Sequence, residues 1–192
     1  MAESALTSRS QAILEARRTI ADQPLYLDTE TTGLDQRAQI VEICLLDHDG
    51  SVLLESLVRP TNRIPLDATR VHGITDATVQ GAPRWSELWP QVQAILAGRS
   101  IAVYNAEFDE RMMRQSHLVH GLPWEPVSGL FFCVMQLYAR FYGEWDSYRG
   151  SYRWQRLEDA GRRLRLPLPN KHRAQADAQL ARAVLHAIAN QT

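Results

Sequence analysis

Two carboxylates stand two residues apart near the end of an apolar segment. The segment runs from Leu25 to Gly33, and the acids are Asp28 and Glu30. Successive side chains of a β-strand alternate between faces, so both carboxylates are expected to project to one face. Two acids on a buried face need a counter-charge, and carboxylate oxygens are ligands that Mg²⁺ and Mn²⁺ select. The pair therefore predicts a metal site that further acids would complete.

The further acids are expected where a strand or a loop meets a helix. A site for two cations needs about four carboxylates, because the cations repel each other unless anionic oxygen bridges them. Asp109 follows the short apolar run from Ser100 to Tyr104, in the first turn of an expected helix. Asp177 lies in the last expected helix, five residues after His172. Four other acids near helix starts are interpreted as solvated surface: Glu107, Glu110, Glu158 and Asp159.

The elements that position these acids follow from hydrophobic periodicity and turn residues. Strands are expected over Leu25 to Glu30, Gln39 to Asp47, Ser51 to Val58, Ser100 to Tyr104 and Leu130 to Val134. Helices are expected over Ser8 to Asp22, Asp67 to His72, Arg84 to Leu96, Ala106 to Leu118, Met135 to Tyr142, Trp154 to Leu164 and Ala174 to Asn190. The first three strands would form an antiparallel trio, and residues 143–152 a loop. Early strands followed by alternating strands and helices predict an α/β fold with a mixed central sheet flanked by helices.

Length and composition indicate one domain without a global basic field. The chain has 192 residues, 45% of them hydrophobic, and a net charge of -1. A single domain over 1–192 is expected, with a lead-in helix in 1–23 and a catalytic core in 24–190. Cys44 and Cys133 lie in apolar runs, which favours a reduced, cytoplasmic setting. No signal peptide or membrane-spanning run is recognised, so no membrane contact is expected.

Three motifs in this order resemble the DEDDh family of 3′-5′ exonucleases. That family includes the proofreading ε subunit of bacterial DNA polymerase III and exoribonucleases of the ribonuclease T kind. The motifs are the Asp-x-Glu of residues 28–30, the Asn-Ala-x-Phe-Asp of residues 105–109 and the His-x4-Asp of residues 172–177. His72-Gly73-Ile74 also resembles a family sequence. The resemblance covers residues 25 to about 188 and implies an RNase H-like fold.

The resemblance also implies two Mg²⁺ or Mn²⁺ ions and a role for each motif residue. By position, Asp28 would bridge both ions, Glu30 and Asp177 would complete the first, and Asp109 would support the second. His172 would be the general base that deprotonates the attacking water, a task that suits histidine, whose unperturbed pKa is about 6.5. Arg173 stands four residues before Asp177, where the tyrosine branch of the family has Tyr. This favours the histidine branch.

Substrate contacts are expected from the turn after the acid pair and from the second motif. The turn of Thr31, Gly33 and Leu34 could offer backbone N–H groups to the 3′-terminal nucleotide, while Leu34 packs against its base. His72 and Asn105 could contact the same nucleotide or its phosphate. Phe108 either stacks on a base or packs in the core.

A basic segment near the C-terminus could hold a single strand. Its cations are Arg149, Arg153, Arg156, Arg162, Arg163, Arg165, Lys171 and Arg173, interleaved with Trp145, Tyr148, Tyr152 and Trp154. Cations with aromatic rings suit a single-strand groove, although an arginine-rich solvated helix face has the same composition.

These observations predict a metal-dependent 3′-5′ exonuclease that acts on single-stranded DNA or RNA 3′ ends by a two-metal mechanism and releases nucleoside 5′-monophosphates. One alternative is an exoribonuclease for short RNA or tRNA ends. Another is a proofreading module that is active only within a polymerase complex. The sequence ends after the last helix, without the tail by which proofreading subunits dock, so docking on a polymerase or clamp is not expected. The oligomeric state, including a homodimer, stays open.

Two departures from the family pattern concern the wall behind the metal site. Tyr104 stands where many relatives have His, and Cys133-Val134-Met135 replaces the usual Cys-Thr-Leu-like turn. Residues 143–152 also form a longer connection than in the proofreading subunits. A differently shaped wall beside the site is therefore expected.

Overall fold

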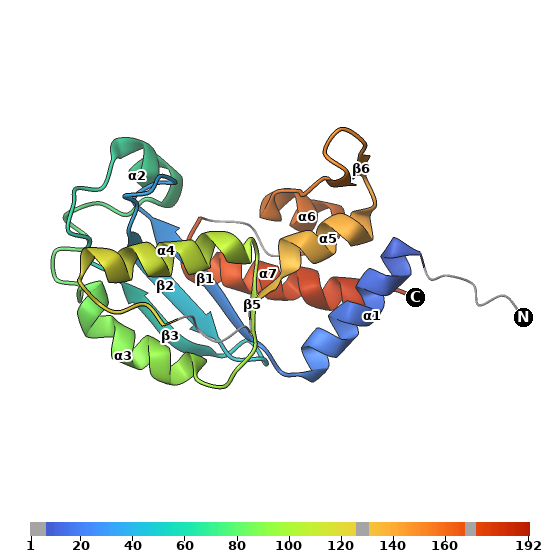
Figure 1. Cartoon of the computed structure of the whole chain (residues 1–192), viewed down its shortest axis with the longest axis horizontal. Coiled ribbons are helices and arrows are strands. Elements are labelled where there is room, and N and C mark those ends of the chain that lie inside the picture. Colours follow the sequence, from blue (N-terminus) through green and yellow to red (C-terminus); the bar gives the residue numbers. More distant parts are fainter. Residues whose placement is uncertain (1–6, 126–130, 168–171) are drawn as a thin grey trace, which may run out of the picture.

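A five-stranded mixed sheet forms the centre of the computed structural model, which describes residues 7–125, 131–167 and 172–192 (Figure 1). Its strands are β1 (Leu25–Thr31), β2 (Ile40–Leu46), β3 (Val52–Leu57), β4 (Ile101–Val103) and β5 (Phe131–Cys133), in the order β3-β2-β1-β4-β5. β1, β2 and β3 pair antiparallel, whereas β1, β4 and β5 pair parallel. The predicted mixed sheet with an antiparallel trio is confirmed.

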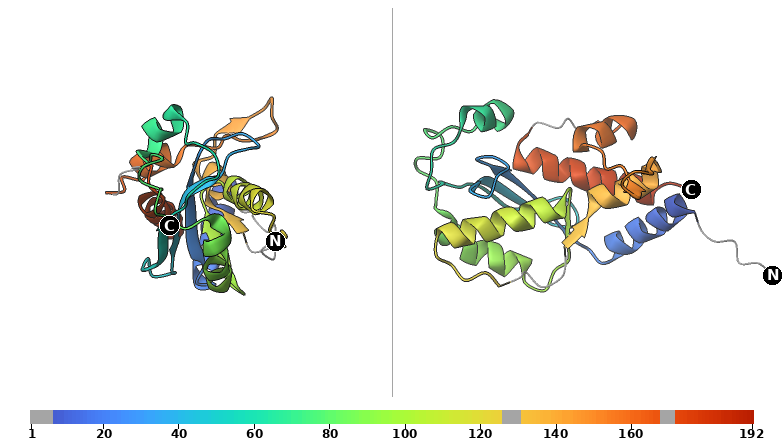
Figure 2. Two further views of the ribbon diagram at one scale, coloured as in Figure 1. Left: turned by 90° about the vertical axis from the view of Figure 1, so that its left-hand side faces the viewer. Right: turned by 45° about the horizontal axis from the view of Figure 1, so that its top comes forward.

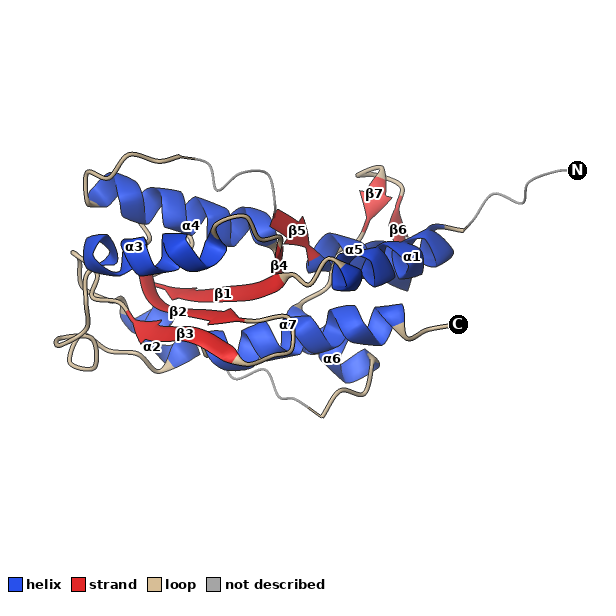
Figure 3. Ribbon diagram, turned by 90° about the horizontal axis from the view of Figure 1, so that it is seen from below, coloured by secondary structure: helices blue, strands red, loops and turns tan. Residues whose placement is uncertain are grey.

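Helices cover both faces of this sheet (Figure 3). They are α1 (Ser8–Ala21), α2 (Leu66–His72), α3 (Trp85–Leu96), α4 (Ala106–Val119), α5 (Val134–Tyr142), α6 (Leu157–Arg163) and α7 (Ala174–Ala189). On one face α3 and α4 pack against a core that includes Leu25 and Leu27. On the other face α7, with α1 and α5 beside it, packs against a core that includes Tyr26 and Cys44 (Figure 2). The alternating side chains of β1 therefore serve two separate cores.

The predicted boundaries are confirmed to within a few residues for most elements. Of the strand expected over Leu130 to Val134, the structure shows β5 over Phe131–Cys133, and Leu130 lies outside the described residues. None of the helices in the described ranges combines the length and the apolar character that a membrane-crossing helix needs.

The prediction of a plain loop over residues 143–152 is wrong, because the chain forms a short hairpin there. Its strands are β6 (Trp145–Asp146) and β7 (Ser151–Tyr152). The Asp146 carboxylate accepts hydrogen bonds from the backbone N–H groups of Tyr148 and Arg149, and Gly150 takes the left-handed conformation that closes the turn. Aspartate and glycine at the turn positions thus stabilise the hairpin, although its strands are too short to show an alternation of apolar and polar residues.

The helix predicted over Trp154 to Leu164 begins only at Leu157. The Arg153 backbone N–H donates to the carbonyl of Glu144, which continues the hairpin pairing past β7. The carbonyl of Gln155 accepts a hydrogen bond from the Tyr104 hydroxyl. These bonds hold residues 153–155 extended, and the arginine-rich helix is correspondingly shorter than expected.

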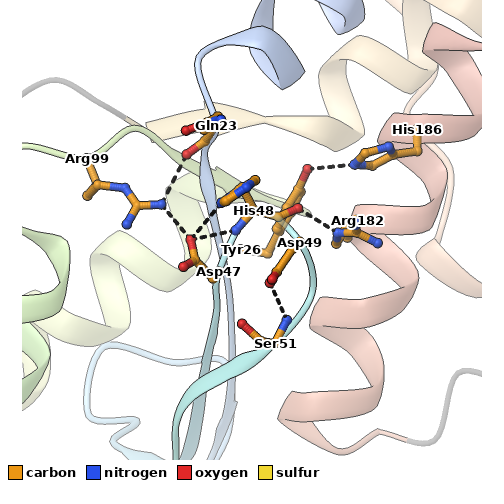
Figure 4. Close-up of polar contacts among 9 residues, drawn as sticks. All are labelled: Gln23, Tyr26, Asp47, His48, Asp49, Ser51, Arg99, Arg182 and His186. Carbon is orange, nitrogen blue, oxygen red and sulfur yellow. Dashed lines mark hydrogen bonds and ion pairs between the residues drawn. The ribbon is translucent and has the colours of Figure 1, made fainter.

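A polar network fixes α7 to the sheet at the end of β2 that lies away from Glu30 (Figure 4). One Arg99 nitrogen donates to the Asp47 carboxylate at 2.7 Å and to the Gln23 carbonyl at 3.2 Å. The hydrogen bond from Arg99 holds the pKa of Asp47 well below its usual range. From α7, Arg182 donates to the carbonyl of His48. The helix that carries Asp177 is therefore held to the sheet near its middle by a polar contact as well as by its apolar face.

Candidate active site

Three carboxylates from two elements converge at the end of β1. Asp28 and Glu30 lie on the face of β1 that α7 covers, and Asp177 lies in the first turn of α7. One oxygen from each of the three carboxylates lies within 4.8 Å of the others. Asp177 is 6% exposed, and the other two acids are half-buried. The structure thus brings three of the four expected acids into one cluster.

The fourth acid, Asp109, reaches the site from the opposite face of the sheet. It lies in the first turn of α4 and is 2% exposed. Thr29 stands between Asp28 and Glu30 and projects to the α4 face, where its hydroxyl donates to Asp109 Oδ1 at 2.7 Å. β1 therefore presents Asp28 and Glu30 on its α7 face, while Thr29 orients Asp109 on its α4 face.

Burial and mutual repulsion oppose the ionisation of these acids. Burial, and then the charges of Asp109 and Asp177, raise the pKa of Asp28 well above its usual range. Burial and the neighbouring acids raise the pKa of Glu30 to about 8, and burial raises that of Asp109 to about 7. A divalent cation would reverse these shifts by supplying the missing positive charge. The donor set, all carboxylate oxygen, fits Mg²⁺ or Mn²⁺.

Thr29→Val is expected to weaken the site without removing an acid. The Thr29 hydroxyl lowers the pKa of Asp109, so its loss raises that pKa further. Asp109 must be ionised to serve a cation, and the acid limb of the profile of kcat/KM against pH should therefore move to higher pH. Loss of such a partner typically costs about 10- to 100-fold in metal affinity, which Mg²⁺ titration of the activity would measure. Thr29→Ser keeps the hydroxyl, and an equal shift in both variants would contradict this role.

Glu42 is a buried acid of the site that the sequence analysis did not single out. It lies on β2 directly opposite Glu30 and is 1% exposed. Like charges at opposite positions of two strands destabilise a sheet. The guanidinium of Arg173 compensates, since its Nε lies 3.0 Å from Glu42 Oε2. The same carboxylate oxygen accepts the backbone N–H of Ala174 at 2.9 Å, so Glu42 fixes the start of α7.

A signal for this ion pair was present in the sequence. Glu42 is the one charged residue in the otherwise apolar segment Ile40–Leu46, whose residues are all buried. A charge in such a strand needs a partner, because an unpaired buried carboxylate is costly. Arg173 stands next to the motif residue His172. What the sequence could not provide is the long-range pairing of β2 with the start of α7.

The turn after the acid pair is held by side chains from two helices. The His72 Nδ1 accepts the Ile74 backbone N–H, so its Nε2–H donates to the carbonyl of Thr31 at 3.2 Å. Burial lowers the pKa of His72, which favours this neutral form. Both ring nitrogens of His72 are therefore engaged with backbone, and its predicted contact with the substrate stays a prediction. Arg111 donates to the carbonyl of Leu34.

Leu34 remains 77% exposed at this turn, and the hydroxyl of Thr31 donates to the carbonyl of Gly33 at 2.7 Å. The turn is thus ordered from within while an apolar side chain projects from it. This arrangement is compatible with the predicted contact between Leu34 and a terminal base, which stays a prediction.

Asn105 and Phe108, both of the second motif, lie in different surroundings. Asn105 precedes α4 in the left-handed conformation, with φ of 72°, and lines a cavity beside the site. Phe108 is half-buried and packs against the core under α3 and α4, with the Arg111 guanidinium 5.3 Å from its ring centre. Of the two interpretations of Phe108, packing is the one that these contacts support.

His172 is exposed and stands two residues before the start of α7. Its backbone φ is 47°, a left-handed conformation that is uncommon for residues other than glycine. Such conformations persist where the surroundings enforce them, and they gather at functional sites. Its expected role as general base stays a prediction.

The mixed sheet and its flanking helices have the fold of RNase H-like exonucleases, and the acids of this chain lie at the end of the central strand. The chain belongs to the exonuclease family of the ribonuclease T kind, whose pattern matches residues 25–185. The resemblance to DEDDh exonucleases is thereby confirmed at the level of the family.

Relatives differ in how much of the chain they match. An uncharacterized exonuclease, CP81, of Escherichia phage 186 is 38% identical over 181 residues, which are 91% of this chain and 92% of the phage protein. A DNA polymerase III subunit epsilon-like protein of Rhodobacter capsulatus is 34% identical over 53% of this chain, and the match spans 16% of that protein. The DNA polymerase III subunit epsilon of Rickettsia felis is 30% identical over 46% of this chain and 42% of its own length.

Solved structures share the fold. Exonuclease X in complex with 5′ overhanging duplex DNA has a TM-score of 0.64 and 29% identity over 86% of this chain and 90% of that one. The nuclease domain of 3′hExo, a DEDDh family member bound to rAMP, has a TM-score of 0.67 and 16% identity over 85% of this chain and 89% of that one. At 16% identity, the similarity to the 3′hExo nuclease domain is a similarity of fold alone.

Proposed function

We propose that the protein is a metal-dependent 3′-5′ exonuclease that hydrolyses single-stranded DNA or RNA from the 3′ end and releases nucleoside 5′-monophosphates. The observation that carries this proposal is the cluster of Asp28, Glu30 and Asp177, with oxygens within 4.8 Å of one another. Asp109 is held beside them by Thr29. Membership of the exonuclease family supports a nuclease activity. The structurally similar exonuclease X was solved in complex with 5′ overhanging duplex DNA, which supports a nucleic-acid substrate.

The four acids would hold two divalent cations, which supply the charge that stabilises the phosphorane-like transition state and the leaving oxygen. The remaining chemistry falls to residues of the chain. His172 would take the proton from the attacking water through a ring nitrogen. A new P–O bond forms as the bond between phosphorus and the 3′ oxygen of the penultimate nucleotide breaks. The products are a nucleoside 5′-monophosphate and a strand with a new 3′-hydroxyl group.

The turn from Thr31 to Leu34 would position the terminal nucleotide. Its backbone is fixed by His72 and Arg111, and the Thr32 N–H donates to the Gln39 carbonyl, so the N–H groups of Gly33 and Leu34 would be presented without a large loss of conformational entropy. Leu34 would pack on the terminal base. None of these proposed contacts would be a hydrogen bond to the edge of a particular base, which is compatible with the removal of any nucleotide.

Digestion of a 5′-labelled oligonucleotide tests the direction and the metal requirement together. With Mg²⁺ or Mn²⁺, we expect a ladder of labelled products that shorten one nucleotide at a time, with mononucleotides as the unlabelled product. EDTA should stop the reaction. Release of the label as a mononucleotide at the first time point would contradict 3′-5′ polarity, and cleavage that persists in EDTA would contradict the metal dependence.

The same assay with DNA and RNA of matched sequence separates the main proposal from an exoribonuclease of short RNA or tRNA ends. The 2′-hydroxyl group is the handle by which a protein distinguishes the two. A proofreading module that needs a polymerase is the other candidate, favoured by relatives named polymerase III epsilon. Full activity of the isolated chain would contradict that candidate.

A further inference from the structure

Two cavities with shared lining residues lie beside the hairpin of β6 and β7, and the larger of them also borders the start of α4 and α5. The larger has a volume of about 560 Å³ and extends from Asn105, across Met135 of α5, to Tyr152 and Trp154. The smaller, of about 300 Å³, shares Tyr152 and Trp154 with it and continues to Arg149 and Arg153. We call the surface formed by the residues that line these two cavities the hairpin groove.

One end of the hairpin groove lies at the start of α4. Asn105 directly precedes α4, whose first turn carries Asp109. The hydroxyl of Tyr104 donates to the carbonyl of Gln155 at 2.9 Å, which ties the chain just after Trp154 to the end of β4. The backbone next to Trp154 is therefore tied to the residue that follows β4, the strand that pairs with β1.

Aromatic surface in the hairpin groove is available for stacking. The side chain of Trp154 is 58% exposed, although it lines both cavities. Tyr152 is braced by Trp145, whose ring meets it edge-on at a centre distance of 5.1 Å. An exposed indole beside a braced aromatic ring offers π-faces that accept any nucleobase.

The charge around the hairpin groove suits a phosphate backbone. The residues that line the two cavities include three arginines, Arg140, Arg149 and Arg153, against two acids, Glu107 and Asp146. Arg149 and Arg153 both lie against the single carboxylate of Asp146, at 4.0 Å and 3.4 Å. Arg153 also pairs with Glu144. The guanidinium groups are thus held in place beside the groove, where phosphates could exchange for the acids.

We propose that the hairpin groove binds the nucleotides that precede the 3′-terminal nucleotide of a single strand. A base of this segment stacks on Trp154, and the phosphates pass along Arg149 and Arg153 as the strand leaves the acids. This inference rests on the proposed function, because it takes the cluster of Asp28, Glu30 and Asp177 as the place of cleavage. It explains why the hairpin replaces a plain connection after α5.

The test compares long and minimal substrates in Trp154→Ala. An oligothymidylate of about 12 nucleotides fills a groove of this kind, whereas the p-nitrophenyl ester of thymidine 5′-monophosphate reaches only the acids. We expect Trp154→Ala to weaken binding of the oligonucleotide about tenfold, as loss of one stacked base does, and to raise its KM by a similar factor. Binding is measured by fluorescence anisotropy in EDTA, so that it does not depend on turnover. Hydrolysis of the small ester should be unchanged.

Two further variants serve as controls. Trp154→Phe keeps a ring and should restore most of the binding. Leu118→Ala removes an apolar side chain that is 80% exposed near the end of α4 and lines neither cavity, so it should behave as the wild type. An equal loss of binding in Leu118→Ala would overturn the assignment to the groove.

The outcomes separate this inference from the proposed function. If the wild type hydrolyses both substrates and Trp154→Ala binds the oligonucleotide as the wild type does, the groove is overturned while the exonuclease stands. A loss of equal size on both substrates would show a disturbed active site and would also overturn the groove. If the wild type hydrolyses neither substrate, the proposed function fails, and the anisotropy of Trp154→Ala still decides whether the groove binds a single strand.

Discussion

Asp28→Asn is expected to lower the rate of oligonucleotide hydrolysis by about 10³-fold, well beyond the roughly 10- to 100-fold cost of losing an outer partner of a metal ligand. Four other carboxylates oppose the ionisation of Asp28, since Asp109, Asp177, Glu30 and Glu42 all raise its pKa. An amide in its place keeps the shape but loses the charge that two cations would share. The rate of mononucleotide release in Mg²⁺ measures the effect.

The same substitution is expected to stabilise the metal-free protein at alkaline pH. The pKa of Asp28 is raised in the folded state, so its favourable contribution is complete below the unfolded pKa of about 3.9 and is lost as pH rises above it. As the pH rises through about 8, Glu30 also loses its proton, and the repulsion among the acids of the wild type grows. Thermal unfolding in EDTA should therefore give a higher Tm for Asp28→Asn than for the wild type, and the difference should shrink toward acid pH.

Added Mg²⁺ provides the control for this pair of effects. Because a cation offsets the repulsion, it should raise the Tm of the wild type at alkaline pH more than that of Asp28→Asn. A variant that stays fully active, or that is less stable than the wild type in EDTA at every pH, would be incompatible with a repelled metal ligand at this position.

Arg173→Leu is expected to destabilise the fold and slow catalysis, although Arg173 belongs to no acid motif. Breaking a buried ion pair costs about 3–5 kcal/mol; because Arg173 is 48% exposed, we expect about 2–3 kcal/mol in the free energy of unfolding. Glu42 would be left buried opposite Glu30 without its counter-charge. Urea unfolding measures the loss, and kcat should fall because the start of α7 carries Asp177.

Two matched variants separate charge from shape at this ion pair. Arg173→Lys keeps the charge but loses the fork that contacts both oxygens of Glu42, so an intermediate loss is expected. Glu42→Gln combined with Arg173→Leu removes the unpaired charge, while Gln can still accept the Ala174 N–H. The double variant should be more stable than Arg173→Leu alone. Additive losses would show that the two residues do not act as a pair.

Much of the fold could be predicted from the sequence because its signals are local. The apolar run around Asp28, the His48-Asp49-Gly50 turn and the amphipathic helix of Trp85–Leu96 each carry their pattern within a few residues. The acids at strand and helix ends were found for the same reason, because motif order and spacing are visible in one dimension.

The features that escaped prediction depend on contacts between distant segments. The pairing of Glu42 with Arg173 joins residues 131 positions apart, and no local pattern specifies it. The hairpin after α5 rests on the Asp146 turn and on a pairing of two residues per strand, which is too short for alternation to show. His72 illustrates the same limit, since only the structure shows that its nitrogens face backbone groups.

The anchoring of Arg173 also defines how the neighbouring residue can travel. Glu42 holds both the Arg173 side chain and the Ala174 N–H, so the chain is fixed immediately after His172. Any approach of His172 to the acids must then arise from rotation about its own bonds. Arg173 thus acts as a pivot, and the distance His172 can cover is limited to the reach of one residue and its imidazole.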